Sequence, residues 1–126
     1  MAVLGKAQSV GVINSGCQPV LVALYADPVG SCGGAFMSTM YYVAPQNTLK
    51  LDMYPGGQYP VTSWYKSPPP GAQFTAIKVY DPSMIWGNIV GFPCMGAGTS
   101  FGPQPGCGIQ ATSNWSNPSL IIVNLF

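Results

Sequence analysis

Hydrophobic and polar residues alternate along short stretches of the chain, most clearly in the stretch 48–54. Its apolar residues are Leu49, Leu51 and Met53, and its charged residues are Lys50 and Asp52. A period of two predicts a β-strand with one buried and one solvated face. Residues 73–80 are rich in β-branched and aromatic side chains, which predicts a second strand. The same criteria predict strands at 9–14, 19–25, 36–43, 59–65, 84–90, 108–115 and 119–125.

The segments between these strands carry turn-forming residues. They include Asp27-Pro28, Pro55-Gly56-Gly57, Pro68-Pro69-Pro70-Gly71, Asp81-Pro82 and Pro103-Gln104-Pro105-Gly106. With 16 Gly and 13 Pro, no segment is left for a long helix. We therefore predict an all-β fold over residues 1–126. It is a single antiparallel β-sandwich of about eight or nine short strands, immunoglobulin-like or jelly-roll-like. A sandwich is preferred to a barrel because 20–24 is apolar on both faces, whereas 48–54 is apolar on one.

The chain carries little charge. Charged residues make up 6% of it, against about 25% in typical globular proteins. There are four lysines and three aspartates, with no Arg, Glu or His, while 48% of the residues are hydrophobic. This balance is the opposite of that in disordered chains. Four scattered lysines cannot form a basic face, so nucleic acid is not an expected partner. No run of 18 apolar residues occurs, so we predict no transmembrane segment.

The residue inventory disfavours catalysis. Without His or Glu the commonest general acids and bases are missing, and neither a Ser-His-Asp nor a Cys-His arrangement can form. Asp27 and Asp81 stand in Asp-Pro turns, where an aspartate usually bonds its own backbone, and Asp52 lies on a solvated strand face. No loop combines two aspartates, as a calcium site would. We expect no enzyme activity, no cofactor and no metal site.

The four cysteines are Cys17, Cys32, Cys94 and Cys107. An even number in a short, loop-rich chain predicts a disulfide framework with three possible connectivities. We favour Cys17–Cys32 and Cys94–Cys107, because each pair brackets a short segment rich in Gly and Pro. The alternatives are a zinc ion held by all four cysteines and reduced, buried thiols. Zinc is disfavoured because no pair has CxxC spacing and the chain has no histidine.

Both ends of the chain have strand character. Residues 1–8 are too short for a complete signal peptide and are either a signal remnant or an edge strand. The segment 119–126 is apolar and uncharged. Natural edge strands are usually blunted by Lys or Pro, so such a strand is either central or an edge that pairs with another chain. We favour the central position. If the strand is an edge, Leu120, Ile121, Ile122 and Val123 are the candidates for self-association.

Aromatic residues interleaved with Asn, Gln, Ser and Gly suggest a second kind of contact surface. Sugar rings stack on Trp and Tyr while amides bind hydroxyls, so this composition suits a glycan-binding surface. The candidates are Trp64 with Tyr65 and Trp115 with Asn114. Trp86 is expected in the core instead. Asn114-Trp115-Ser116 also matches the N-glycosylation acceptor pattern.

Several stretches resemble a group of secreted proteins. They are Val12-Ile13-Asn14-Ser15-Gly16-Cys17, the run from Val20 to Pro28, Tyr42-Val43-Ala44-Pro45-Gln46-Asn47-Thr48, and the run from Pro69 to Asp81. Together they resemble uncharacterised small secreted β-sandwich proteins of Bacteroidetes, and Ala7-Gln8 is similar to the end of their signal peptides. The resemblance implies export and a β-sandwich, and it carries over no functional residue.

These observations predict a secreted, extracellular or cell-surface protein that acts by contact and not by catalysis. The first hypothesis is a structural, self-associating protein, a homo-oligomer or the partner of another extracellular surface. Chains packed against copies of themselves must dehydrate much of their surface, and a shortage of charge makes this easier. The alternative is a lectin-like carbohydrate-binding module.

Overall fold

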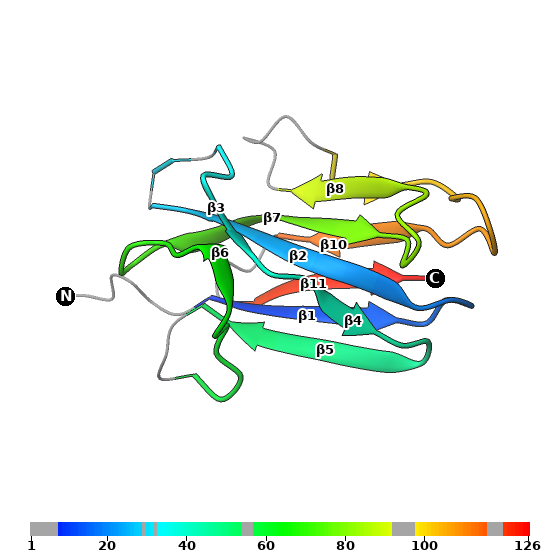
Figure 1. The fold of residues 1–126 in the computed structure, drawn as a ribbon, viewed down its shortest axis with the longest axis horizontal. Helices are drawn as coiled ribbons and strands as arrows, with labels where there is room; N and C mark the ends of the chain where they lie inside the picture. The colour runs from blue at the N-terminus through cyan, green and yellow to red at the C-terminus, as the bar shows by residue number, and fades with distance from the viewer. Residues whose placement is uncertain (1–7, 29, 32, 54–56, 92–97, 116–119) are drawn as a thin grey trace.

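The computed structural model describes residues 8–28, 30–31, 33–53, 57–91, 98–115 and 120–126. These residues hold eleven strands and no helix (Figure 1). The strands are β1 (Ser9–Asn14), β2 (Val20–Asp27), β3 (Phe36–Ser38), β4 (Tyr41–Val43), β5 (Asn47–Asp52), β6 (Trp64–Lys66), β7 (Gln73–Tyr80), β8 (Gly87–Gly91), β9 (Ser100–Phe101), β10 (Ala111–Asn114) and β11 (Leu120–Leu125).

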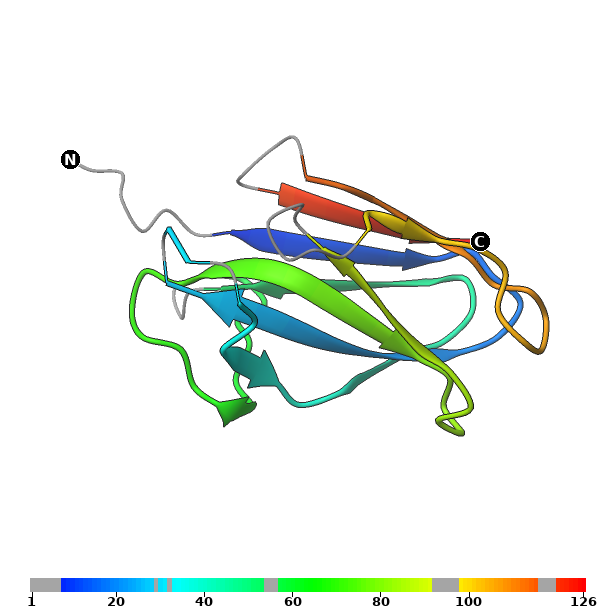
Figure 2. The ribbon, with the colours of Figure 1, turned by 90° about the horizontal axis from the view of Figure 1, so that it is seen from above.

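The strands form two sheets that pack face to face (Figure 2). The five-stranded sheet has the order β5-β1-β11-β10-β9, and β1 runs parallel to β11. The six-stranded sheet has the order β6-β3-β2-β7-β8, with β4 paired to β2 beside β3. All pairs other than β1–β11 are antiparallel. The prediction of a purely antiparallel sandwich is therefore wrong for this pair, because the first and last strands lie side by side in the same direction.

The core lies between the sheets and comes from the inward positions of both. β1 contributes Val10 and Val12, and β11 contributes Ile121 and Val123. Across from them, β2 and β7 supply an almost continuous apolar layer that includes Leu24. Trp86 is 8% exposed and belongs to this core, which confirms its predicted place. β2 is central in its sheet, as its two-sided apolar character predicted.

The strand boundaries match the sequence pattern where a strand crosses the middle of a sheet. β1 and β7 coincide with the predicted 9–14 and 73–80. The differences are largest in the short strands. The predicted strand 36–43 is two short strands, β3 and β4; 59–65 forms a strand only at its end; and β9 was not predicted. The count of eight or nine strands is thus wrong. Short edge strands follow tertiary pairing more than their own pattern.

Candidate functional site

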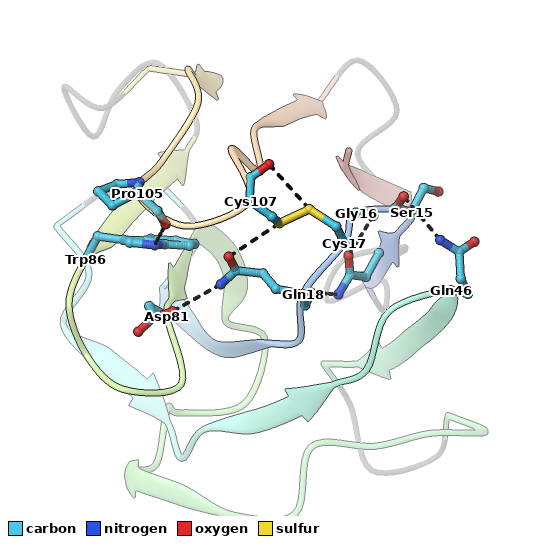
Figure 3. Close-up of a disulfide and its surroundings, with 10 residues drawn as sticks. Ser15, Gly16, Cys17, Gln18, Gln46, Asp81, Trp86, Pro105 and Cys107 are labelled. Carbon is cyan, nitrogen blue, oxygen red and sulfur yellow. Dashed lines mark hydrogen bonds between the residues drawn. A yellow bond between two sulfur atoms is a disulfide. The ribbon is translucent and has the colours of Figure 1, made fainter.

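One disulfide connects two loops at the same end of the sandwich. Cys17, in the β1–β2 connection, bonds Cys107, in the loop before β10, with a Cα–Cα distance of 6.1 Å (Figure 3). The predicted Cys17–Cys32 and Cys94–Cys107 pairs are therefore wrong. Nearness in sequence was the wrong criterion, because the sandwich brings residues 90 positions apart together. Cys32 and Cys94 lie outside the described residues.

A polar network surrounds this disulfide and holds the β7–β8 turn in place. The amide of Gln18 donates to Asp81 Oδ1 (3.1 Å), and its Oε1 lies 3.5 Å from Sγ of Cys107 (Figure 3). Asp81 Oδ2 accepts from the backbone N–H of Ser83 (2.9 Å). The indole N–H of Trp86 donates to the carbonyl of Pro105 (3.2 Å). The turn is thus fixed to two other loops, with Asp81 bonding its own backbone as expected of an Asp-Pro turn.

Two apolar side chains stand out from this anchored turn. Met84 is 51% exposed and Ile85 is 73% exposed; we call these two residues the tip. Met84 has a φ of 60°, a conformation that costs free energy for a residue with a Cβ. The backbone N–H of Met84 donates to the carbonyl of Asp81 (2.8 Å), which stabilises this conformation. Hydrogen bonds therefore stabilise a strained turn whose side chains are apolar and exposed.

A second feature is a groove of about 560 Å³ on the outer face of the five-stranded sheet, here called the outer groove. Its lining residues are Ser9, Val10, Gly11, Ile13, Thr48, Lys50, Asp52, Gly57, Gln58, Tyr59, Leu120 and Ile122. In the sheet register Gly11 lies between Ile122 on one side and Lys50 on the other. Because Gly11 has no side chain, the sheet is hollow there, with an apolar wall on β11 and a polar wall on β5.

The polar end of the outer groove is built around Asp52. Its carboxylate accepts hydrogen bonds from the Ser9 hydroxyl and from the backbone N–H of Tyr59 (2.8 Å). The Ser9 hydroxyl and the N–H groups of Tyr59 and Gln58 outweigh burial and hold the pKa of Asp52 below its ordinary value of 3.8. A Cβ at Gly57 would lie 2.6 Å from this carboxylate, so only glycine lets the loop close over it. Asp52 thus fixes the loop that ends the groove.

Four tyrosines gather on the outer face of the six-stranded sheet; we call this surface the tyrosine face. They are Tyr25, Tyr42, Tyr65 and Tyr80, of which Tyr42 and Tyr65 are 62% and 64% exposed. Burial and the nearby Tyr80 raise the pKa of Tyr25, and burial and the nearby Tyr65 raise the pKa of Tyr80. Tyr42 and Tyr80 pair with Leu21 from opposite sides. The Lys78 ammonium lies 4.9 Å from the centre of the Tyr80 ring.

The structure divides the predicted glycan-binding residues between two sheets. Tyr65 lies on the tyrosine face, but its neighbour Trp64 is half-buried against the core. Trp115 also packs against the core, and its indole N–H donates to the Ser113 hydroxyl (2.8 Å). Asn114 is exposed on the outer face of the five-stranded sheet, paired across the ladder with Ile122. These four residues therefore do not form one surface.

The predicted self-association residues lie on a central strand. β11 has β1 on one side and β10 on the other, which confirms the central position and excludes β11 as a pairing edge. Ile121 and Val123 face the core and are at most 1% exposed. Leu120, 42% exposed, and Ile122 face outward into the outer groove. β1 is central as well, so neither terminal strand offers a free edge, and residues 1–7 lie outside the described residues.

Sequence reasoning missed Gly11, Ile13, Met84 and Ile85. The stretch 84–90 was predicted as one strand, but β8 begins only at Gly87, so Met84 and Ile85 belong to the turn. The Asp81-Pro82 pair was the signal for that turn. Ile13 and Ile122 alternate correctly for outward positions, but nothing in the sequence indicates that two distant strands place them around Gly11.

The described residues show little that could hold a metal or cross a membrane. Among them no group of three or more His, Cys, Asp or Glu gathers at one place. The same residues include no helix of the length and apolarity that a membrane span requires. Comparison of the chain with protein-family models, with curated proteins and with solved structures finds no match.

Proposed function

We propose that this protein is a non-catalytic, extracellular structural protein that associates with copies of itself through the outer face of its five-stranded sheet. The observation that carries this proposal is the apolar centre of that face. The solvated side of a sheet is normally polar. Here Ile13, Ile122 and Leu120 line the groove around Gly11, and the Ile122 side chain packs beside this glycine.

Two further observations support self-association. A formal net charge of +1 on seven charged groups leaves little repulsion between copies. Two charged side chains line the groove, Asp52 and Lys50. The Asp52 carboxylate already accepts hydrogen bonds from Ser9 and Tyr59, so burying the groove would leave Lys50 as the main charged group to desolvate. An extracellular location is compatible with the Cys17–Cys107 disulfide, since such bonds persist in oxidising compartments.

The test is the mass of the protein in solution as a function of concentration, by light scattering and sedimentation. We expect the wild-type mass to rise with concentration. Leu120→Lys places a charge on the groove wall at an exposed position and should return the mass to that of the monomer. Ser67→Lys, at an exposed loop residue away from the groove, is the matched control and should assemble like wild type. A wild-type protein that stays monomeric at its solubility limit would refute the proposal.

The tyrosine face favours a second candidate function, the binding of a neutral polysaccharide. Exposed phenol rings offer stacking surfaces for sugars. A Cβ at Gly87 would lie 2.9 Å from the Tyr80 ring, so this ring packs directly on the glycine backbone, which restricts its position. A fixed ring loses little freedom when a ligand stacks on it. Because the neighbouring Lys78 ammonium already lies against the Tyr80 ring, the remaining phenol surface suits an uncharged ligand with many hydroxyl groups.

Affinity electrophoresis in gels containing soluble β-glucan, xylan or dextran tests this second candidate. The wild-type protein should be retarded by one of these polysaccharides. In the double variant Tyr42→Ala with Tyr65→Ala, the apparent affinity for that polysaccharide should fall at least tenfold, because each lost stacking contact costs about 1 kcal/mol or more. Tyr59→Ala is the control, since Tyr59 is an exposed tyrosine on the other side of the molecule. Equal retardation of all three proteins would eliminate the tyrosine face as the binding surface.

A further inference from the structure

The tip has the properties of a preformed contact point. Of the described large apolar side chains, Ile85 is the most exposed. The turn is held by Asp81, Gln18 and Trp86, so the tip loses little freedom when it is buried. An exposed apolar group on a strained, over-determined backbone is a recurring feature of binding sites.

The outer groove has the complementary shape and chemistry. It is concave over Gly11 and apolar along Ile13 and Ile122. Its volume is about 560 Å³, which is several times the roughly 150 Å³ of a cavity that holds one benzene molecule. Two aliphatic side chains therefore fit within it. The tip carries no charge, and at the groove the charged side chains, Lys50 and Asp52, both stand on the β5 side.

The tip and the groove face different directions on one molecule. The β7–β8 turn projects from one end of the sandwich on the side of the six-stranded sheet, whereas β1 and β11, which carry the groove, form the opposite layer (Figure 2). A molecule therefore cannot fill its own groove with its own tip. A contact between two different patches is heterologous, and repeating it produces an open filament or a ring.

We infer that Met84 and Ile85 of one copy insert into the outer groove of the next copy, so that the protein assembles head to tail. This inference rests on the proposed self-association and specifies its geometry. Each copy contributes one tip and one groove. Burial of the tip against Ile13, Ile122 and Leu120 removes from water both apolar side chains of the tip and the exposed Leu120 on the groove wall.

Complementation between two variants tests this geometry. Ile85→Lys changes the tip at an exposed position and leaves the groove intact. Gly11→Val fills the floor of the groove and leaves the tip intact; its Cβ would lie 3.4 Å from Cδ1 of Ile122, an ordinary contact. Each variant alone should be monomeric. An equimolar mixture should form pairs of twice the monomer mass and stop there, because only one tip and one groove remain functional in each pair.

The outcomes separate this inference from the proposal beneath it. A wild-type protein that never assembles refutes both. A second case is that wild type assembles and Leu120→Lys does not, so self-association through the groove stands. If in that case Ile85→Lys still assembles normally, or the mixture gives no pairs, the head-to-tail geometry is wrong. Should Gly11→Val lose its thermal transition, Leu120→Lys replaces it as the groove variant in the mixture. Pair formation in the mixture, absent from either variant alone, establishes the tip–groove contact.

Discussion

At the scale of single residues, the aspartates act as structural anchors. Asp27 is 1% exposed and accepts from the N–H groups of Gly34 (2.8 Å) and Ala35 (2.9 Å) and from the Thr75 hydroxyl (2.6 Å). Burial by itself would raise the pKa of Asp27, but these hydrogen bonds outweigh it and hold that pKa below its ordinary value of 3.8. The carboxylate fixes the β2–β3 loop to β7, next to the bulge between Tyr25 and Ala26.

The first prediction concerns acid stability. A carboxyl group with a lowered pKa in the folded state contributes stability above its unfolded pKa of about 3.9, and this contribution is lost as the pH falls through the folded pKa. Asp27→Asn should cost about 1–3 kcal/mol at pH 7, because the buried donors lose a charged acceptor. The same variant should lose less stability than wild type between pH 5 and pH 2, measured by thermal melting.

Thr75→Val is the matched control for this prediction. It keeps the carboxylate and removes one of its donors, so its loss of stability below pH 4 should lie between those of wild type and Asp27→Asn. Identical pH profiles for all three proteins would show that Asp27 does not anchor the loop. The sequence identified Asp27 only as the start of an Asp-Pro turn. Its actual donors come from residues 7, 8 and 48 positions away, which a local pattern cannot reveal.

At the scale of elements, period-two alternation predicts which residues face the core but not which strands are neighbours. Val10 and Val12 on β1 and Leu51 on β5 are buried as alternation requires. Their pairing into one sheet, and the parallel alignment of β1 with β11, depend on the path of the whole chain. The outer groove therefore could not be predicted, since its walls come from strands that lie far apart along the chain.

The second prediction uses two adjacent residues of β11. Ile121→Lys places a charge in the core of a central strand and should cost more than about 4 kcal/mol or prevent folding. Leu120→Lys changes the next residue, on the opposite face, and should cost less than about 1 kcal/mol. Urea unfolding of both variants measures the difference. A larger cost for Leu120→Lys than for Ile121→Lys would mean that β11 is shifted by one residue, since such a slip exchanges the two faces.

At the scale of the whole molecule, a long-range disulfide holds the loops at one end of the sandwich together. The Cys17–Cys107 bond fixes the β1–β2 connection to the loop that also accepts the Trp86 hydrogen bond. Gln18, next to Cys17, bonds Asp81 at the base of the tip. The cysteine count correctly indicated disulfide chemistry. The pairing was not predictable, because it depends on which loops the two sheets bring to one end.

The third prediction concerns this disulfide. It closes a loop of 90 residues. In the chain-entropy treatment a loop near this length contributes about 4–5 kcal/mol, against about 3 kcal/mol for a 15-residue loop such as Cys17–Cys32 would close. Cys17→Ser with Cys107→Ser should therefore lower the free energy of unfolding by about 2–5 kcal/mol, the range typical of removing a native disulfide from a small domain.

Peptide mapping of the unreduced protein decides the pairing on which this third prediction rests. A digest should yield one disulfide-linked pair of peptides containing Cys17 and Cys107, and any second intramolecular bridge must then join Cys32 to Cys94. The single variant Cys17→Ser leaves an unpaired thiol at Cys107, so it tests whether that thiol, and not the lost cross-link, affects stability. It should be about as unstable as the double variant, because either change removes the same cross-link.

The double variant should also assemble less well than wild type, since the disulfide supports Gln18 and, through Asp81, the tip. Recovery of a Cys17–Cys32 peptide pair would contradict the arrangement of loops at this end of the sandwich.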